Sequence, residues 1–191
     1  MKTPSKIVLI GASTGGPGQI EKIIKELPLL KDSAIIIAQH MSVGFMHSFS
    51  RQLQAHNQNT ILVAADKDYL EIGKVYTCCG DIKLKQDNLG VYFIKKALGD
   101  KSHFNPDINN VFNSFLPICK SIEILCVILT GIGRDGVDAC KALSLCGCKT
   151  ITEDEKSSIV DGMTGKARAE VKDIKVMSID AIAKDIKEFC S

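Results

Sequence analysis

A serine, a histidine and an aspartate stand just beyond the carboxyl ends of three apolar segments of this chain. Ser13 lies in the stretch Gly-Ala-Ser-Thr-Gly-Gly at 11–16, His40 follows an isoleucine-rich run, and Asp135 follows another apolar run. A serine hydroxyl that attacks a carbonyl needs a base, and that base needs an anion to fix its tautomer and stabilise its charged form. The three residue types therefore predict a serine hydrolase in which Ser13 is the nucleophile.

A second glycine-rich stretch, Thr-Gly-Ile-Gly-Arg-Asp-Gly at 130–136, surrounds Asp135. It precedes an expected helix, so its backbone N–H groups lie where a developing oxyanion can be held. Each residue of the set also has a structural interpretation. Serine and aspartate are common helix N-caps, and a single histidine is often only a satisfied structural residue. The coincidence of all three at strand ends favours the catalytic interpretation.

Other uses of the first glycine-rich loop fit the residues less well. In a dinucleotide site, Ser13 would replace the middle glycine, and Gln39-His40 would stand where an acidic residue is expected. A phosphate-binding P-loop requires Gly-Lys followed by Ser or Thr, which is missing here. The α/β-hydrolases carry the order serine, acid, histidine, whereas this chain runs Ser13, His40, Asp135.

Composition narrows the classes of partner and cofactor. The 24 basic and 22 acidic residues give a net charge of +2, too weak a basic field to favour nucleic acid binding. No stretch approaches the roughly 18 apolar residues of a membrane span, so we expect a cytoplasmic protein without membrane insertion. The eight cysteines lack metal-ligand spacing, and we expect free thiols, no metal and no cofactor.

Short unbroken apolar runs alternate with amphipathic stretches, a pattern typical of parallel strands covered by helices on both faces. We therefore expect a single α/β domain over residues 1–191, with a doubly wound, mostly parallel sheet. The expected strands of this sheet are 6–10, 34–38, 61–64, 124–129 and 149–152. Short strand-like pieces within 74–94, separated by turn residues, predict an antiparallel hairpin insertion that begins with Val75 to Cys78.

Helix signals lie between the expected strands. Pro17 suits the first turn of a helix that ends near Leu27, and Phe45, Phe49 and Leu53 mark one face of a second helix. The remaining expected helices are 108–119, 136–145 and 179–189, the last of them capped by Ser178.

Four separated motifs together resemble one known family. They are Gly-Ala-Ser-Thr-Gly-Gly-Pro at 11–17, Gln-His-Met at 39–41, Leu-Thr-Gly-Ile-Gly-Arg-Asp-Gly at 129–136, and Asp154-Glu155 with Gly162-Met163. In this order they are similar to the catalytic domain of the CheB family of chemotaxis protein-glutamate methylesterases. The resemblance extends from about Lys6 to Phe189.

The resemblance implies a reaction and roles for particular residues. Ser13 would attack the γ-methyl ester of a glutamate on the cytoplasmic helices of a methyl-accepting chemoreceptor, with His40 as base and then acid, and Asp135 orienting His40. It further implies that the amide of Ile132 contributes to the oxyanion site and that Thr14 supports the histidine. Some relatives also deamidate receptor glutamines. A silent receptor-binding adaptor and a general small-ester hydrolase remain alternatives.

Departures from the family pattern add further expectations. The first motif begins at residue 11, so we expect no receiver domain and an enzyme that is constitutively open or restrained by another protein. Lys83, Asn109 and Glu153 differ from the residues usual in relatives, and we expect them to reshape the rim that receives the substrate. We expect His103 to be solvated or structural, and its loop is the one to test for proximity to the site. We expect alanine at any triad position to leave the fold intact.

Overall fold

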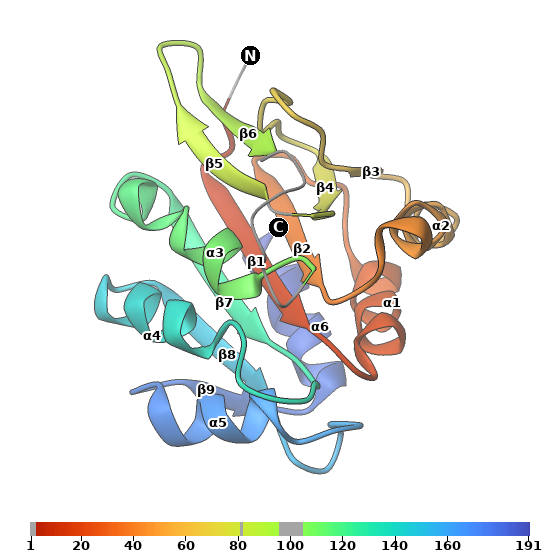
Figure 1. The fold of residues 1–191 in the computed structure, drawn as a ribbon, viewed down its shortest axis with the longest axis vertical. Coiled ribbons are helices and arrows are strands. Elements are labelled where there is room, and N and C mark those ends of the chain that lie inside the picture. The colour runs from red at the N-terminus through yellow and green to blue at the C-terminus, as the bar shows by residue number, and fades with distance from the viewer. Residues whose placement is uncertain (1–2, 81, 96–104) are drawn as a thin grey trace.

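The computed structural model describes residues 3–80, 82–95 and 105–191. Within these residues a seven-stranded sheet has the order β3-β4-β2-β1-β7-β8-β9, and every neighbouring pair is parallel (Figure 1). Its strands are β1 (Lys6–Ala12), β2 (Ser33–Gln39), β3 (Thr60–Val63), β4 (Lys74–Thr77), β7 (Glu123–Ile128), β8 (Lys149–Glu153) and β9 (Lys175–Met177).

Helices cover both faces of this sheet, as predicted (Figure 1). The helices α1 (Gly16–Glu26), α2 (Val43–Gln54) and α6 (Ile179–Phe189) pack on one face. The other face carries α3 (Ile108–Asn113), α4 (Val137–Leu145), α5 (Met163–Glu170) and the antiparallel hairpin of β5 (Ile82–Gln86) and β6 (Val91–Lys95). The chain therefore has the predicted doubly wound α/β architecture in one domain.

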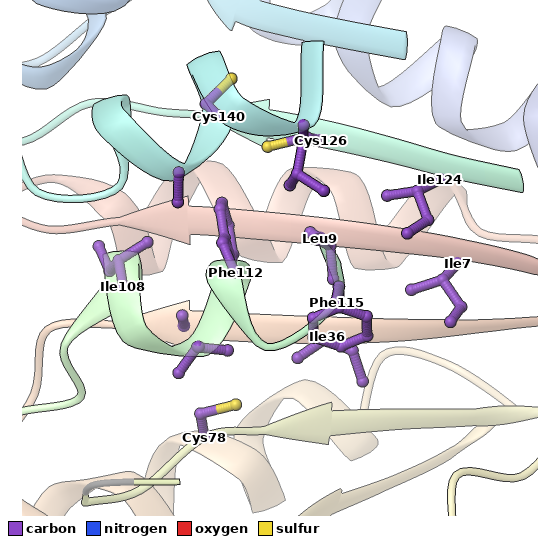
Figure 2. Close-up of a cluster of buried hydrophobic side chains, with 14 of the residues drawn as sticks. Ile7, Leu9, Ile36, Cys78, Ile108, Phe112, Phe115, Ile124, Cys126 and Cys140 are labelled. Atoms are coloured by element: carbon purple, nitrogen blue, oxygen red, sulfur yellow. The ribbon is translucent and has the colours of Figure 1, made fainter. Parts of the chain in front are cut away.

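Alternate residues of the buried strands supply the two cores. Ile7 and Leu9 of β1 join the core under α3 and α4, whereas Val8 and Ile10 join the core under α1 and α6. This is why the strands are apolar without interruption: both of their faces are buried. Figure 2 shows the first core, in which Phe112 and Ile108 of α3 lie over β1 and its neighbours. Buried cysteine thiols fill part of the same layer, among them Cys78, Cys126 and Cys140 (Figure 2).

The topology reverses at β1, and this determines where a site can form. From β1 the chain first passes to β2 on one side and later returns to β7 on the other. Gly11 of β1 pairs with Ala38 of β2 and with Ile128 of β7, so these three strands end at the same level. Connections diverge from such a reversal point and leave a crevice at the carboxyl ends of the strands.

Two of the element predictions are wrong. The segment starting at Val75 was expected to open the hairpin, but it forms β4, a parallel strand between β2 and β3. Only β5 and β6 form the hairpin, drawn at the top of Figure 1. The single helix expected over 108–119 is interrupted: α3 ends at Asn113, and a separate 3-10 turn spans Leu116–Ile118 around Pro117. Proline lacks the N–H that a continuous helix needs at this point.

Other predicted details are confirmed. Pro17 lies in the first turn of α1, and the Ser178 hydroxyl accepts a hydrogen bond from the Ala181 amide at the start of α6. Across the residues that the structure describes, no helix combines the length and the apolar character needed to cross a membrane.

Candidate active site

The three residues singled out from the sequence meet at the carboxyl ends of β1, β2 and β7. Ser13 Oγ lies 3.0 Å from His40 Nδ1, and His40 Nε2 lies 2.7 Å from Asp135 Oδ2. The His40 side chain is 13% exposed and that of Asp135 is 4% exposed, so the hydrogen-bonded chain runs from the surface inward. The structure therefore brings the predicted nucleophile, base and anion into succession.

The imidazole of His40 presents Nδ1 to the serine and Nε2 to the aspartate. A neutral imidazole has one N–H donor and one acceptor nitrogen. Because the Asp135 carboxylate only accepts hydrogen bonds, it selects the tautomer with hydrogen on Nε2. Nδ1 then carries a lone pair directed at the Ser13 hydroxyl, which is the state that a general base requires.

Ser13 is not the N-cap of α1, and that structural interpretation is wrong. The N-cap is Gly15, whose φ of 84° is left-handed, and no side chain caps the helix. The turn is closed by backbone instead, since the Gly16 amide donates to the Ser13 carbonyl over 2.9 Å. A left-handed residue at this corner favours glycine. The serine hydroxyl is consequently left to face His40.

Gln39 holds Ser13 and His40 together, a role that sequence reasoning missed. Its side chain is 1% exposed, and Nε2 donates to the carbonyls of both Ser13 and His40 over 2.9 Å. A Cβ at Gly16 would lie 2.1 Å from Gln39 Oε1, so only glycine leaves room for this amide. The sequence signal for this contact is the combination of Gln39-His40 with Gly15-Gly16, because the missing side chain at Gly16 makes room for the Gln39 amide.

Besides His40, the Asp135 carboxylate has two backbone amides as hydrogen-bond partners. Its Oδ2 accepts from the Ile108 amide over 2.8 Å, and Oδ1 accepts from the Asn109 amide over 3.0 Å. These amides begin α3, and the N-cap of α4 is Gly136, so the interpretation of Asp135 as the cap of its own helix is wrong. Burial raises the pKa of the carboxyl, but the bonds from His40 and the two amides outweigh it and lower the pKa overall. Asp135 is therefore ionised beside the imidazole.

The second glycine-rich loop passes directly against the serine. A Cβ at Gly131 would lie 2.7 Å from Ser13 Cβ and 2.4 Å from Met163 Sδ, so a side chain at this position is incompatible with the site. The Ile132 side chain next to it is 65% exposed, and in the part of the chain that the structure describes its amide has no hydrogen-bond partner. Thr14 is exposed beside Ser13. The oxyanion role of Ile132 and the supporting role of Thr14 stay predictions.

The expectation that Glu153 lies on the substrate rim is wrong. Glu153 is fully buried at the end of β8, where it accepts from Gln19 Nε2 over 2.5 Å and from the Thr130 amide over 3.2 Å. Burial raises the pKa of its carboxyl. The charged residues that follow Glu153 in the sequence are typical of an exposed turn, so the sequence did not indicate that its side chain is buried next to Thr130. Asn109 is likewise engaged internally, since its Oδ1 accepts from the Ala139 amide.

Lys83 and His103 are the two remaining residues that sequence reasoning considers near the site. Lys83 is half-buried on β5, and its effect on a substrate stays a prediction. His103 lies outside the described residues.

Comparisons with known proteins agree with this architecture. The family model described as CheB methylesterase matches residues 8–186. A protein-glutamate methylesterase/protein-glutamine glutaminase of Rhizobium meliloti is 36% identical over 97% of this chain and 52% of its own length. One of Carboxydothermus hydrogenoformans is 33% identical over 96% of this chain and 53% of its own length. The chain thus spans about half the length of these curated relatives.

A solved structure is also similar. The crystal structure of the Thermotoga maritima CheB methylesterase catalytic domain superposes with a TM-score of 0.89 at 30% sequence identity. The match covers 97% of this chain and 99% of that one.

Proposed function

Because the chain belongs to the CheB methylesterase family, we propose that it hydrolyses glutamate γ-methyl esters on the cytoplasmic helices of methyl-accepting chemoreceptors. The observation that carries the proposal is the hydrogen-bonded succession from Ser13 Oγ through His40 to Asp135. The names of the curated relatives supply the substrate class.

In the first half-reaction, Ser13 Oγ attacks the ester carbonyl carbon while His40 Nδ1 takes the hydroxyl proton. Asp135 stabilises the imidazolium that forms, because its pKa is lowered and its Oδ2 accepts from Nε2. The carbonyl oxygen gains negative charge and is held by the Ile132 amide. His40 then returns the proton to the methoxy oxygen, methanol leaves, and an acyl ester remains on Ser13.

In the second half-reaction, His40 removes a proton from water, and the resulting hydroxide attacks the acyl carbon. The carbon–oxygen bond to Ser13 breaks and His40 gives the proton back to Ser13 Oγ. The carboxylic acid of the product loses its proton to solvent, and a free glutamate carboxylate is released. The same groups suit glutamine deamidation, since His40 can give its proton to the amide nitrogen as the carbon–nitrogen bond breaks, so that ammonia leaves. The relatives' names include this glutaminase activity, and we propose it as a second reaction of the same site.

The test is release of labelled methanol from a methylated receptor fragment. Ser13→Ala removes the nucleophile, so we expect the rate to fall by roughly a thousandfold or more. Ser5→Ala is a matched control, because Ser5 is an exposed serine just before the opposite end of β1, and we expect it to keep the wild-type rate.

Each outcome separates the candidate functions. Methanol release that survives Ser13→Ala reassigns the nucleophile. A wild-type chain that binds the receptor fragment without releasing methanol is an adaptor and contradicts the proposal. Rapid cleavage of soluble esters with no preference for the receptor identifies a general small-ester hydrolase.

A further inference from the structure

Thr130 lies two residues beyond the end of β7, is fully buried, and makes hydrogen bonds with its amide, its carbonyl and its hydroxyl. It directly precedes Gly131, the residue whose backbone passes against Ser13. Thr130 takes no direct part in the proposed catalytic steps. A buried polar side chain so close to a nucleophile calls for a physical explanation.

The backbone of Thr130 ties the nucleophile to a deeper layer. Its carbonyl accepts from the Ser13 amide over 3.0 Å, and its own amide donates to Glu153 Oε2 over 3.2 Å. Glu153 is in turn held by Gln19, whose Nε2 also donates to the Ser157 carbonyl over 2.8 Å. The Ser13 backbone is therefore connected to the fully buried Glu153 carboxylate through two successive hydrogen bonds, both made by the Thr130 peptide groups.

The hydroxyl of Thr130 connects two loops. Oγ1 accepts from the Val160 amide over 2.8 Å and lies 3.0 Å from the Thr14 carbonyl and 3.2 Å from the Val160 carbonyl, to either of which it can donate its one hydrogen. The loop after β7 and the loop after β8 are joined a second time by the Gly131 amide, which donates to the Val160 carbonyl over 3.0 Å. The loop after β1, the loop after β7 and the loop after β8 thus meet at one side chain.

We propose that Thr130 is a positioning residue for the hydrolysis: its hydroxyl and peptide group fix Ser13 and Thr14 relative to the Ile132 amide, with Glu153 as the anchor. The inference rests on the proposed function. Nucleophile and oxyanion donor sit on different loops, so their separation depends on what joins those loops. A misplacement of about 1 Å at a reacting group costs on the order of a hundredfold in rate.

The test compares two substitutions that remove the hydroxyl and the methyl group of the threonine side chain separately. Thr130→Val keeps the shape and loses the hydroxyl, whereas Thr130→Ser keeps the hydroxyl and loses the methyl group. For methanol release we expect Thr130→Val to lower kcat by roughly 10- to 100-fold and Thr130→Ser to stay within about threefold of wild type. KM should change less than about twofold in both, because neither variant alters a group that touches substrate.

A second measurement separates this inference from the proposed function. The rate at which a soluble phosphonate ester modifies Ser13, followed by mass spectrometry on the folded protein, needs no receptor. We expect Thr130→Val to slow this modification and Thr130→Ser to restore it. If wild type releases no methanol but the modification follows this order, the proposed substrate fails and the positioning role stands.

Two results overturn the inference. One is a wild-type kcat and modification rate in Thr130→Val, and the other is a loss in Thr130→Ser as large as that in Thr130→Val, which would show that the effect does not depend on the hydroxyl. If Thr130→Val does not fold, Thr130→Cys takes its place. A thiol fills the site but bonds weakly, so we expect a severalfold loss of kcat, and an unchanged kcat refutes the role of the hydroxyl.

Discussion

Two buried carboxylates flank Ser13, and their surroundings shift their pKa values in opposite directions. Asp135 lies on the α3 side of the sheet, and its pKa is lowered. Glu153 lies at the end of β8 beneath the loop that carries Thr130, and its pKa is raised. Both are removed from solvent, so burial alone does not determine the ionisation of either group.

The opposite pKa shifts of Asp135 and Glu153 depend on whether the hydrogen-bond donors around each carboxylate outweigh its burial. Asp135 receives hydrogen bonds from the His40 imidazole and from two backbone amides, which together outweigh the cost of burial. At Glu153, burial dominates over bonds from Ser157, Thr130 and Gln19, and the neighbouring charge of Asp154 raises the pKa further. A carboxylate that stabilises an imidazolium must be ionised, whereas one that holds a loop needs only to accept hydrogen bonds.

The largest effect should follow from removing the charge of Asp135 while keeping its shape. Asp135→Asn places an amide where three donors converge, and it no longer selects the productive tautomer of His40. We expect kcat for methanol release to fall by roughly 10³- to 10⁴-fold. Asp138→Asn is the control: Asp138 lies three residues further on, exposed in an ion pair with Arg134, and should leave kcat unchanged.

A second substitution measures the structural part of the Asp135 role. Asp135→Ala leaves the Ile108 and Asn109 amides without their acceptor, and we expect it to lower the free energy of unfolding by about 2 kcal/mol in urea titrations. This replaces the sequence-based expectation that all three alanine variants fold like wild type. Ser13→Ala should still do so, and equal unfolding midpoints for the two variants would contradict this distinction.

The smallest expected effect concerns the pH dependence of stability. The folded-state pKa of Asp135 is lowered, so its contribution is present above the unfolded pKa and is lost as the pH falls through the folded value. The folded-state pKa of Glu153 is raised, so its contribution is present below the unfolded pKa and is lost as the pH rises through the folded value.

Glu153→Gln removes the second of these contributions. Relative to this variant, wild type should lose stability as the pH rises from the ordinary carboxyl range through the raised pKa of Glu153. Urea titrations of both proteins across that range measure the difference, with the exposed Glu155→Gln as control. Parallel curves for wild type and Glu153→Gln would show that Glu153 ionises normally.

The sequence predicted the sheet and the triad because both leave local signals. Strands buried on both faces appear as unbroken apolar runs, and residues just after such runs must meet at one edge of the sheet. Elements without such signals were missed. The three-residue edge strand β9 has two exposed residues, and α5 buries only Met163, Thr164 and Ala167 of its eight.

Other features depend on tertiary contacts that no local pattern reveals. Glu153 adjoins further acidic and basic residues, which is typical of a surface turn, and only the tertiary contact between α1 and the end of β8 places Gln19 against it. Thr130 belongs to a recognised motif, but its contact with the Thr14 carbonyl spans 116 residues. The use of His40 Nδ1 toward the serine likewise follows from the ring lying between Ser13 Oγ and Asp135 Oδ2, which are far apart in the sequence.

The order of the triad along the chain has a consequence for biosynthesis. His40 and Asp135 are 95 residues apart and meet only because β7 pairs with β1, the first strand. A ribosome-bound chain that has emerged only as far as β6 holds the serine and the histidine, but neither the aspartate nor the second glycine-rich loop. The proposed site is therefore complete only after β7 and the glycine-rich loop that follows it have been made and β7 has paired with β1.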